Sequence, residues 1–239
     1  EIADAVMFTN YFIIGPAAFG DHIEGSTAAS DANADGYTLT VADLVYMIRV
    51  IQGDALEYPK PAPGALFEVV SQGNTVTMNT SEDAGAALLV FNVDGTVVIP
   101  TVNNGMNVEY GFENGELRVL VYNIGDNALT TGTELTLDVT GSVELVEVEA
   151  ATFAGAVMEA SVRNLPTAYD LAQNYPNPFN PTTTIRLALP AASDFALEIY
   201  NIAGQKVRTF NGAAEAGTLE IVWDGKDASG STVASGVYF

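Results

Sequence analysis

The chain contains no cysteine, one histidine and only eight Lys and Arg residues among 239. The absence of cysteine removes disulfides, thiolate catalysis and Cys-type zinc sites together. With His22 as the only histidine, a two-histidine metal centre is excluded, and a Ser-His-Asp triad would depend on one residue beside Gly20-Asp21. A surface histidine is the simpler interpretation of His22.

Basic charge is scarce as well. Thirty Asp and Glu residues give a net charge of -22, so the chain should repel nucleic acid and anionic membranes and attract divalent cations. No apolar run reaches the roughly 18 residues that a membrane span requires. Glu1 opens no basic-then-apolar leader, so a signal peptide would lie upstream.

Motifs of the common enzyme classes are also missing. The chain has neither a phosphate-binding loop nor a dinucleotide-binding glycine pattern. Pairs of carboxylates could in principle hydrolyse glycosides, but no motif selects two of the thirty acids. The sequence therefore predicts a protein without catalytic activity.

Oxygen-bearing side chains alternate along the segment 31–43, which reads DANADGYTLTVAD. Asp31, Asn33 and Asp35 would point three oxygens inward, Gly36 would allow the sharp turn, and Tyr37 would offer its carbonyl oxygen. This pattern predicts a calcium loop followed by a helix. The alternative is a solvated turn rich in Asp and Asn that caps the helix without metal.

The residue that closes the loop departs from the EF-hand spacing. The twelfth position is Ala42, and Asp43 stands one step later. We therefore expect one inserted residue between Gly36 and Asp43, forming a bulge at 37–39, with Asp43 as the closing ligand. Metal binding should then be coupled to folding of the segment, because a cation offsets its concentrated negative charge.

The loop-following helix is repeated at a constant offset. Residues 2–8 (IADAVMF) align with residues 41–47 (VADLVYM), and both stretches keep apolar residues at helical spacing. Asp4 occupies the place of Asp43 in the first repeat, so it would be the last ligand of a calcium loop upstream of Glu1. Together, residues 1–57 resemble a dockerin, the paired loop–helix module of bacterial extracellular assemblies. The resemblance implies cohesin-type protein partners, although the insert 15–30 is unusual for the family.

A second module is expected after the proline-rich segment 58–64 (YPKPAPG), which predicts a semi-rigid linker. Beyond it the periodicity becomes alternating, in short β-rich runs broken by Gly, Asn and Asp at 75–78, 87–91, 95–99, 117–122, 134–139 and 143–148. This pattern is typical of a β-sandwich. Residues 65–163 resemble a cohesin-like jelly-roll, most closely in their second half; any nine-strand sandwich could look similar.

A third module is expected over 164–239. It opens with the proline-rich stretch 171–185 (LAQNYPNPFNPTTTI), continues with 197–207 (LEIYNIAGQKV), and ends with WDGKD at 223–227 and VASGVYF at 233–239. In order and spacing this resembles the C-terminal sorting domain of type IX secretion cargo, an immunoglobulin-like sandwich related to flagellar hook-cap domains. Gly204 should make a hairpin turn, and Trp223 should fill the core. The family usually continues past Val-Tyr-Phe, so we expect the domain to be incomplete at its C-terminus.

The predicted fold is thus mainly β: a small helical dockerin-like calcium-binding module followed by two β-sandwiches. We expect a secreted, non-enzymatic, calcium-stabilised subunit of an extracellular fibre or cell-surface scaffold, exported by a Gram-negative bacterium through a type IX-like route. Its partners would be copies of itself or other cohesin- or dockerin-bearing proteins, which makes it a homo-oligomer or filament. The alternative is the non-catalytic C-terminal tail of a large secreted protease or glycoside hydrolase.

Overall fold

A computed structural model describes residues 2–28, 30–55 and 64–239. The chain divides into two compact units, Glu1–Asn164 and Leu165–Phe239. Both are built mainly from β-strands, as predicted, and only the first unit carries helices. The predicted linker at 58–64 lies outside the described residues except for Gly64.

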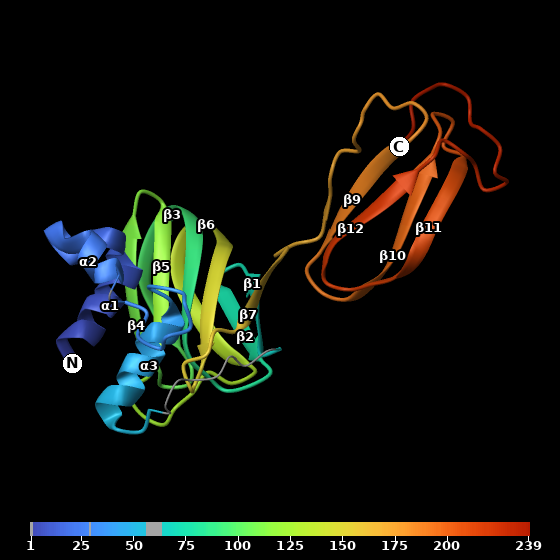
Figure 1. Ribbon diagram of the computed structural model, residues 1–239. Coiled ribbons are helices and arrows are strands. Elements are labelled where there is room, and N and C mark those ends of the chain that lie inside the picture. The colour runs from blue at the N-terminus through green and yellow to red at the C-terminus, as the bar shows by residue number, and fades with distance from the viewer. Residues whose placement is uncertain (1, 29, 56–63) are drawn as a thin grey trace. The chain divides into compact units, whose positions relative to one another are not determined.

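The helices of the first unit occupy its N-terminal third (Figure 1). They are α1 (Ile2–Ile14), the 3-10 helix η1 (Gly15–His22), α2 (Ile23–Ala28) and α3 (Val41–Gln52). Thr40 directly precedes helix α3, and its hydroxyl caps the helix by accepting a hydrogen bond from the Asp43 amide. Gly53 directly follows the helix; it adopts the left-handed conformation (φ 82°) and donates its amide to the carbonyls of Arg49 and Val50. The two repeated stretches predicted as helical lie in α1 and α3.

Seven strands of the first unit form one continuous hydrogen-bonded sheet in the order β4-β5-β3-β6-β2-β1-β7. The strands are β1 (Leu66–Gln72), β2 (Thr75–Thr80), β3 (Ala84–Val102), β4 (Asn107–Glu113), β5 (Glu116–Tyr122), β6 (Thr133–Thr152) and β7 (Glu159–Leu165). The N-terminal half of β3 pairs with β5 and with the C-terminal half of β6, whereas the N-terminal part of β6 pairs with β2. The two long strands therefore run through both layers of the sandwich.

The long strands correct the prediction of separate short strands. The runs 87–91 and 95–99 both lie in β3, and the runs 134–139 and 143–148 both lie in β6. Gly95 and Gly141 sit opposite each other in the ladder, each with positive φ. A Cβ atom at Gly95 would lie 1.6 Å from the Thr140 carbonyl oxygen, so only glycine permits this close approach. The ladder continues through both glycines.

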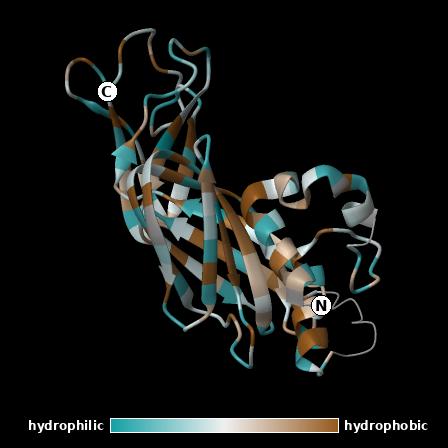
Figure 2. Ribbon diagram, turned by 90° about the vertical axis from the view of Figure 1, so that its left-hand side faces the viewer, coloured by the Kyte–Doolittle hydropathy of each residue, from teal (hydrophilic) through white to brown (hydrophobic). Residues whose placement is uncertain are grey.

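Both faces of β3 are covered where it crosses the centre of the sheet. Ala87, Leu89 and Phe91 face the core between the layers, while Ala86, Leu88 and Val90 belong to a second apolar cluster. That second cluster includes residues of α1 and α3, among them Phe8, Phe12, Leu44, Val45 and Ile48. Apolar residues recur along these helices as well as along the strands (Figure 2). We call α1 and α3 with their connecting residues, 2–28 and 30–55, the helical layer.

The second unit is a smaller β-sandwich. It contains β8 (Asp170–Leu171), β9 (Thr183–Leu189), β10 (Ser193–Tyr200), β11 (Lys206–Ala214) and β12 (Gly217–Trp223), in two sheets with orders β10-β11 and β12-β9-β8. Trp223 is only 2 % exposed and contacts the rings of Phe179 and Tyr238. Gly204, with positive φ, lies in the turn that joins β10 to β11. The predicted core role of Trp223 and the predicted hairpin at Gly204 are confirmed.

The predicted division into three modules stays a prediction. The structure packs the first two predicted modules into one compact unit. The junction at Asn164 and Leu165 separates the two compact units. The predicted first and second modules, in contrast, share one unit and one apolar cluster. The helical layer is therefore a covering of the sandwich in this structure.

Candidate calcium site

The predicted loop is held in a tight turn by bonds from backbone amides to acidic side chains. Asp31 accepts hydrogen bonds from the amides of Asp35 (3.0 Å) and Gly36 (3.2 Å). The Asp35 amide also reaches the side-chain oxygen of Asn33 at 3.2 Å, and the Asp35 carboxylate accepts from the Tyr37 amide at 2.8 Å. Asp31, Asn33 and Asp35 thus bring their oxygens together around one turn of chain.

Asp43 approaches the same turn from the first turn of α3. One carboxylate oxygen accepts the amides of Ala32 (2.8 Å) and Asn33 (3.4 Å), and the other accepts the amide and hydroxyl of Thr40, both at 2.9 Å. Asp43 is fully buried, and this burial raises the pKa of its carboxyl group against the opposing effect of these hydrogen bonds. Asp43 therefore ties the start of the loop to the start of the helix.

These residues fit a calcium ion in chemistry. Carboxylate, amide and main-chain oxygens are the ligands that Ca²⁺ takes. Across the described part of the chain, no three Asp, Glu, His or Cys side chains form a metal cluster by themselves. A calcium ion here would accordingly need the Asn33 amide oxygen and main-chain oxygens besides the carboxylates. Each carboxylate oxygen of Asp43 already accepts two hydrogen bonds. Asp43 would therefore have to give up one of these bonds to act as a calcium ligand.

The remaining predicted residues whose side chains the structure describes lie at the surface of the loop and helices or close to the helix cap. Tyr37 is 68 % exposed, and its amide donates to the Asp35 carboxylate. Leu39 adopts positive φ (59°), which locates the irregular backbone of the predicted insertion directly before the helix cap at Thr40. Asp4 is exposed in the first turn of α1. The side chain of His22 is outside the described residues. The ligand assignment as a whole stays a prediction.

Residues that the sequence did not single out join this loop and the helical layer to the sandwich. The side-chain nitrogen of Asn33 donates to the carbonyl of Gly155 in the β6–β7 turn at 3.1 Å. The Arg118 side chain on β5 donates to the carbonyl of Phe12 at 2.6 Å. Glu149 on β6 accepts a bond from the backbone of Val41 at the start of α3. No local pattern marks these partners, because each pair is distant along the chain.

One side of β10 is only partly paired among the described residues. β10 pairs with β11 on one side, and on its other side Tyr200 exchanges backbone hydrogen bonds with Phe239 at 2.8 and 2.9 Å. Among the described residues, no further segment pairs with 193–199 on that side. Because N–H groups alternate along a strand, the amides of Asp194, Ala196 and Glu198 point to the same side as that of Tyr200.

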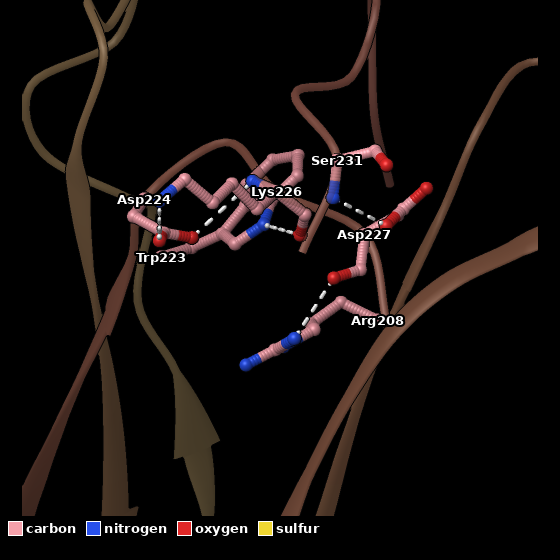
Figure 3. Close-up of polar contacts among 6 residues, drawn as sticks. All are labelled: Arg208, Trp223, Asp224, Lys226, Asp227 and Ser231. Carbon is pink, nitrogen blue, oxygen red and sulfur yellow. Dashed lines mark hydrogen bonds and ion pairs between the residues drawn. The ribbon is translucent and has the colours of Figure 1, made fainter. Parts of the chain in front are cut away.

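The residues after β12 form a turn, which is held by hydrogen bonds from side chains to main-chain carbonyls (Figure 3). The Trp223 indole donates to the Lys226 carbonyl at 2.9 Å, and Arg208 on β11 donates to the Asp227 carbonyl at 2.8 Å. Hydrogen bonds, the strongest from the Ser229 side chain, hold the pKa of Asp227 below its usual range. These contacts use the polar groups to stabilise the turn.

Comparison with known proteins identifies one segment. Residues 177–239 match the family described as the FlgD Ig-like domain. No curated protein matches the chain. The second unit is therefore an immunoglobulin-like β-sandwich, as predicted.

Two solved structures show partial likeness. One is a non-cellulosomal cohesin from the hyperthermophilic archaeon Archaeoglobus fulgidus, at 10% identity and a TM-score of 0.30. The other comes from a type I cohesin–dockerin complex of Clostridium thermocellum, at 11% identity and a TM-score of 0.29. Each match covers 44% of this chain and 92% of the other chain. Scores at this level carry no argument about function, and the dockerin and sorting-domain resemblances stay predictions.

Proposed function

We propose that this protein is a secreted, non-enzymatic structural protein that acts as a calcium-stabilised subunit of an extracellular fibre or cell-surface scaffold. The acidic, cysteine-free composition, the motifs typical of a type IX sorting domain and the FlgD Ig-like match support this proposal. None of the described helices is long and apolar enough to span a bilayer.

The main observation in favour of assembly is the edge of β10 over 193–199, which pairs with no described segment on the side away from β11. The backbone amides and carbonyls of this edge can therefore pair with an added strand; the antiparallel pairing of Asn201 with Tyr238 supports an antiparallel arrangement. Unpaired edges recruit strands from other chains and bind through main-chain hydrogen bonds. Addition of a strand from a neighbouring copy would repeat head to tail, which gives rings or open filaments.

The dockerin–cohesin-like route to assembly is less direct. The helical layer covers the sheet of its own chain, so binding the sheet of a neighbour would require this layer to leave its own. Strand addition at β10 requires no such rearrangement. It is therefore the favoured contact in this proposal.

A matched pair of proline variants tests the assembly contact. Ala196→Pro removes an amide that points to the open edge of β10, whereas Ala213→Pro removes an amide on the far edge of β11. Both positions are exposed. Light scattering and electron microscopy across a calcium titration should show oligomers for the wild type and Ala213→Pro, and their loss in Ala196→Pro, with thermal unfolding verifying that each variant folds.

A strictly monomeric wild type at high protein and calcium concentration would contradict the fibre proposal. It would favour the non-catalytic tail of a larger secreted enzyme. Oligomers that persist in folded Ala196→Pro would place the contact elsewhere on the chain.

A further inference from the structure

The helical layer meets the sandwich at positions where glycine allows close approach. A Cβ atom at Gly85 would lie 2.9 Å from a Val45 methyl group, and one at Gly111 would lie 2.6 Å from the Ile13 carbonyl oxygen. At Gly155 it would lie 3.2 Å from the Tyr46 amide. These contacts involve α1 and α3 together with strands β3 and β4 and the β6–β7 turn, so the layer is docked in one defined position.

Asn33 links this docking to the candidate calcium loop. It is 2 % exposed, and the two ends of its amide group have different partners. The oxygen accepts the Asp35 amide inside the loop, and the nitrogen donates both to the Asp35 carboxylate (2.9 Å) and to the Gly155 carbonyl of the sandwich (3.1 Å). Gly155 also packs directly against Tyr46 of α3. A single buried side chain thus bridges the loop and the docking surface.

We infer that Asn33 is a positioning residue that couples calcium binding in the loop to docking of the helical layer on the sandwich. The inference rests on the calcium site of the proposed function. A ligand that binds only the ordered loop also stabilises every contact that requires the loop to be ordered. The Asn33–Gly155 bond is such a contact, because the loop orients the Asn33 amide. Calcium should consequently hold the layer down and keep the apolar residues of β3 beneath it covered.

Adjacent alanines on β3 provide reporters of undocking. Ala86 is buried beneath the helical layer, and its neighbour Ala87 is buried in the core between the two layers of strands. Cysteine is a small, largely apolar replacement for either, and the chain has no other cysteine. A thiol reagent should label Ala86→Cys whenever the layer undocks, whereas Ala87→Cys should react only when the sandwich itself opens. The ratio of the two rates isolates undocking.

The expected result is that saturating calcium slows labelling of Ala86→Cys about tenfold or more relative to chelator. Labelling of Ala87→Cys should be slower in both conditions.

Asn33→Asp keeps an oxygen that can bind calcium but loses the nitrogen that donates to Gly155. In the Ala86→Cys background, calorimetry first measures the calcium affinity of this variant, and labelling is then compared at calcium concentrations that saturate it. The calcium-dependent slowing should shrink severalfold even at saturation. Asn10→Asp, a matched charge change on the exposed side of α1, should preserve the slowing.

The outcomes separate the coupling from the calcium site itself. If calorimetry shows calcium binding but the wild-type background labels Ala86→Cys equally fast with calcium and chelator, the coupling is overturned and the site stands. If the slowing persists fully in Asn33→Asp, Asn33 is not the link. If no calcium binds, the calcium site and the coupling both fall, and the test of the β10 edge is unaffected.

Discussion

The two compact units protect their strands in opposite ways. In the first unit every residue from Ala84 to Phe91 is buried, because the helical layer covers one face of β3 and the opposing strands cover the other. In the second unit, burial alternates along β12, whose Ile221 and Trp223 face the core while Val222 is exposed. A strand with two covered faces depends on elements that are distant in sequence. β12 has one covered face, and its pairing partner β9 belongs to the same small unit.

This difference predicts two separate unfolding transitions. The first unit should melt as a whole, since its helices and strands share an apolar cluster. The second should respond only to changes within 165–239. Each variant below tests whether the units are independent or whether the first unit is itself divided.

The largest effect is expected from Trp223→Ala. It removes the most voluminous core side chain of the second unit and should cost about 3–5 kcal/mol, enough to unfold a unit of this size. Calorimetry should show loss of the second unit's transition and an unchanged first transition. Arg186→Ala is the control, because its exposed ion pair with Glu220 should contribute less than about 1 kcal/mol. A shift of the first transition in Trp223→Ala would contradict independence.

Neighbouring leucines on β3 test whether the helical layer and the sandwich are one unit. Leu88→Ala removes a side chain beneath the helices, and Leu89→Ala removes one from the inner core. Each should destabilise the first unit by about 2–5 kcal/mol. Followed by both helical circular dichroism and a sandwich probe such as hydrogen exchange, each variant should show coincident transitions. Helices that melt early in Leu88→Ala while the strands remain protected would mean that the layer is a separate module.

A smaller, pH-dependent effect is expected from Glu149→Gln. Burial raises the pKa of Glu149 above its ordinary value of 4.5, with the repulsion of Glu147 adding to this, while the backbone of Val41 and the charge of Arg118 oppose it. The folded state therefore binds the proton more tightly than the unfolded chain, so this contribution to stability is full below pH 4.5 and is lost as pH rises through the folded-state pKa. In chelator, Glu149→Gln should be more stable than wild type at pH 7, with the difference vanishing near pH 4. A difference independent of pH would exclude this carboxyl as the cause.

Local patterns predicted the local structure well. The alternating oxygens of 31–35 do form a tight turn, the repeated apolar spacing lies in helices, and Trp223 fills the second core. Each of these follows from residues close together in the chain. The Thr40 cap was also readable, since Thr followed three residues later by Asp is a capping pattern.

Two features of the first unit were not predictable from local pattern. Asp94 and Gly95 predict a break between strands, but Gly95 faces Gly141 and both strands continue past this point. The docking of the helices was also missed, although the uninterrupted apolar run 86–91 indicates a strand covered on both faces. Such a run predicts that both faces of the strand are buried, but it does not identify the element that packs on the second face. The identity of the cover depends on contacts such as Arg118 with Phe12, more than a hundred residues apart.

The continuous ladder through Gly95 and Gly141 has a mechanical consequence. Many sandwiches can separate by sliding one sheet off the other, which breaks side-chain packing but leaves each ladder intact. Here β3 and β6 pair from Ala84 with Thr152 to Val102 with Leu135, through both layers. Parting the layers therefore requires this one hydrogen-bonded ladder to be straightened or torn. Under tension the first unit should accordingly yield in one abrupt step, with no stage at which two intact sheets have come apart.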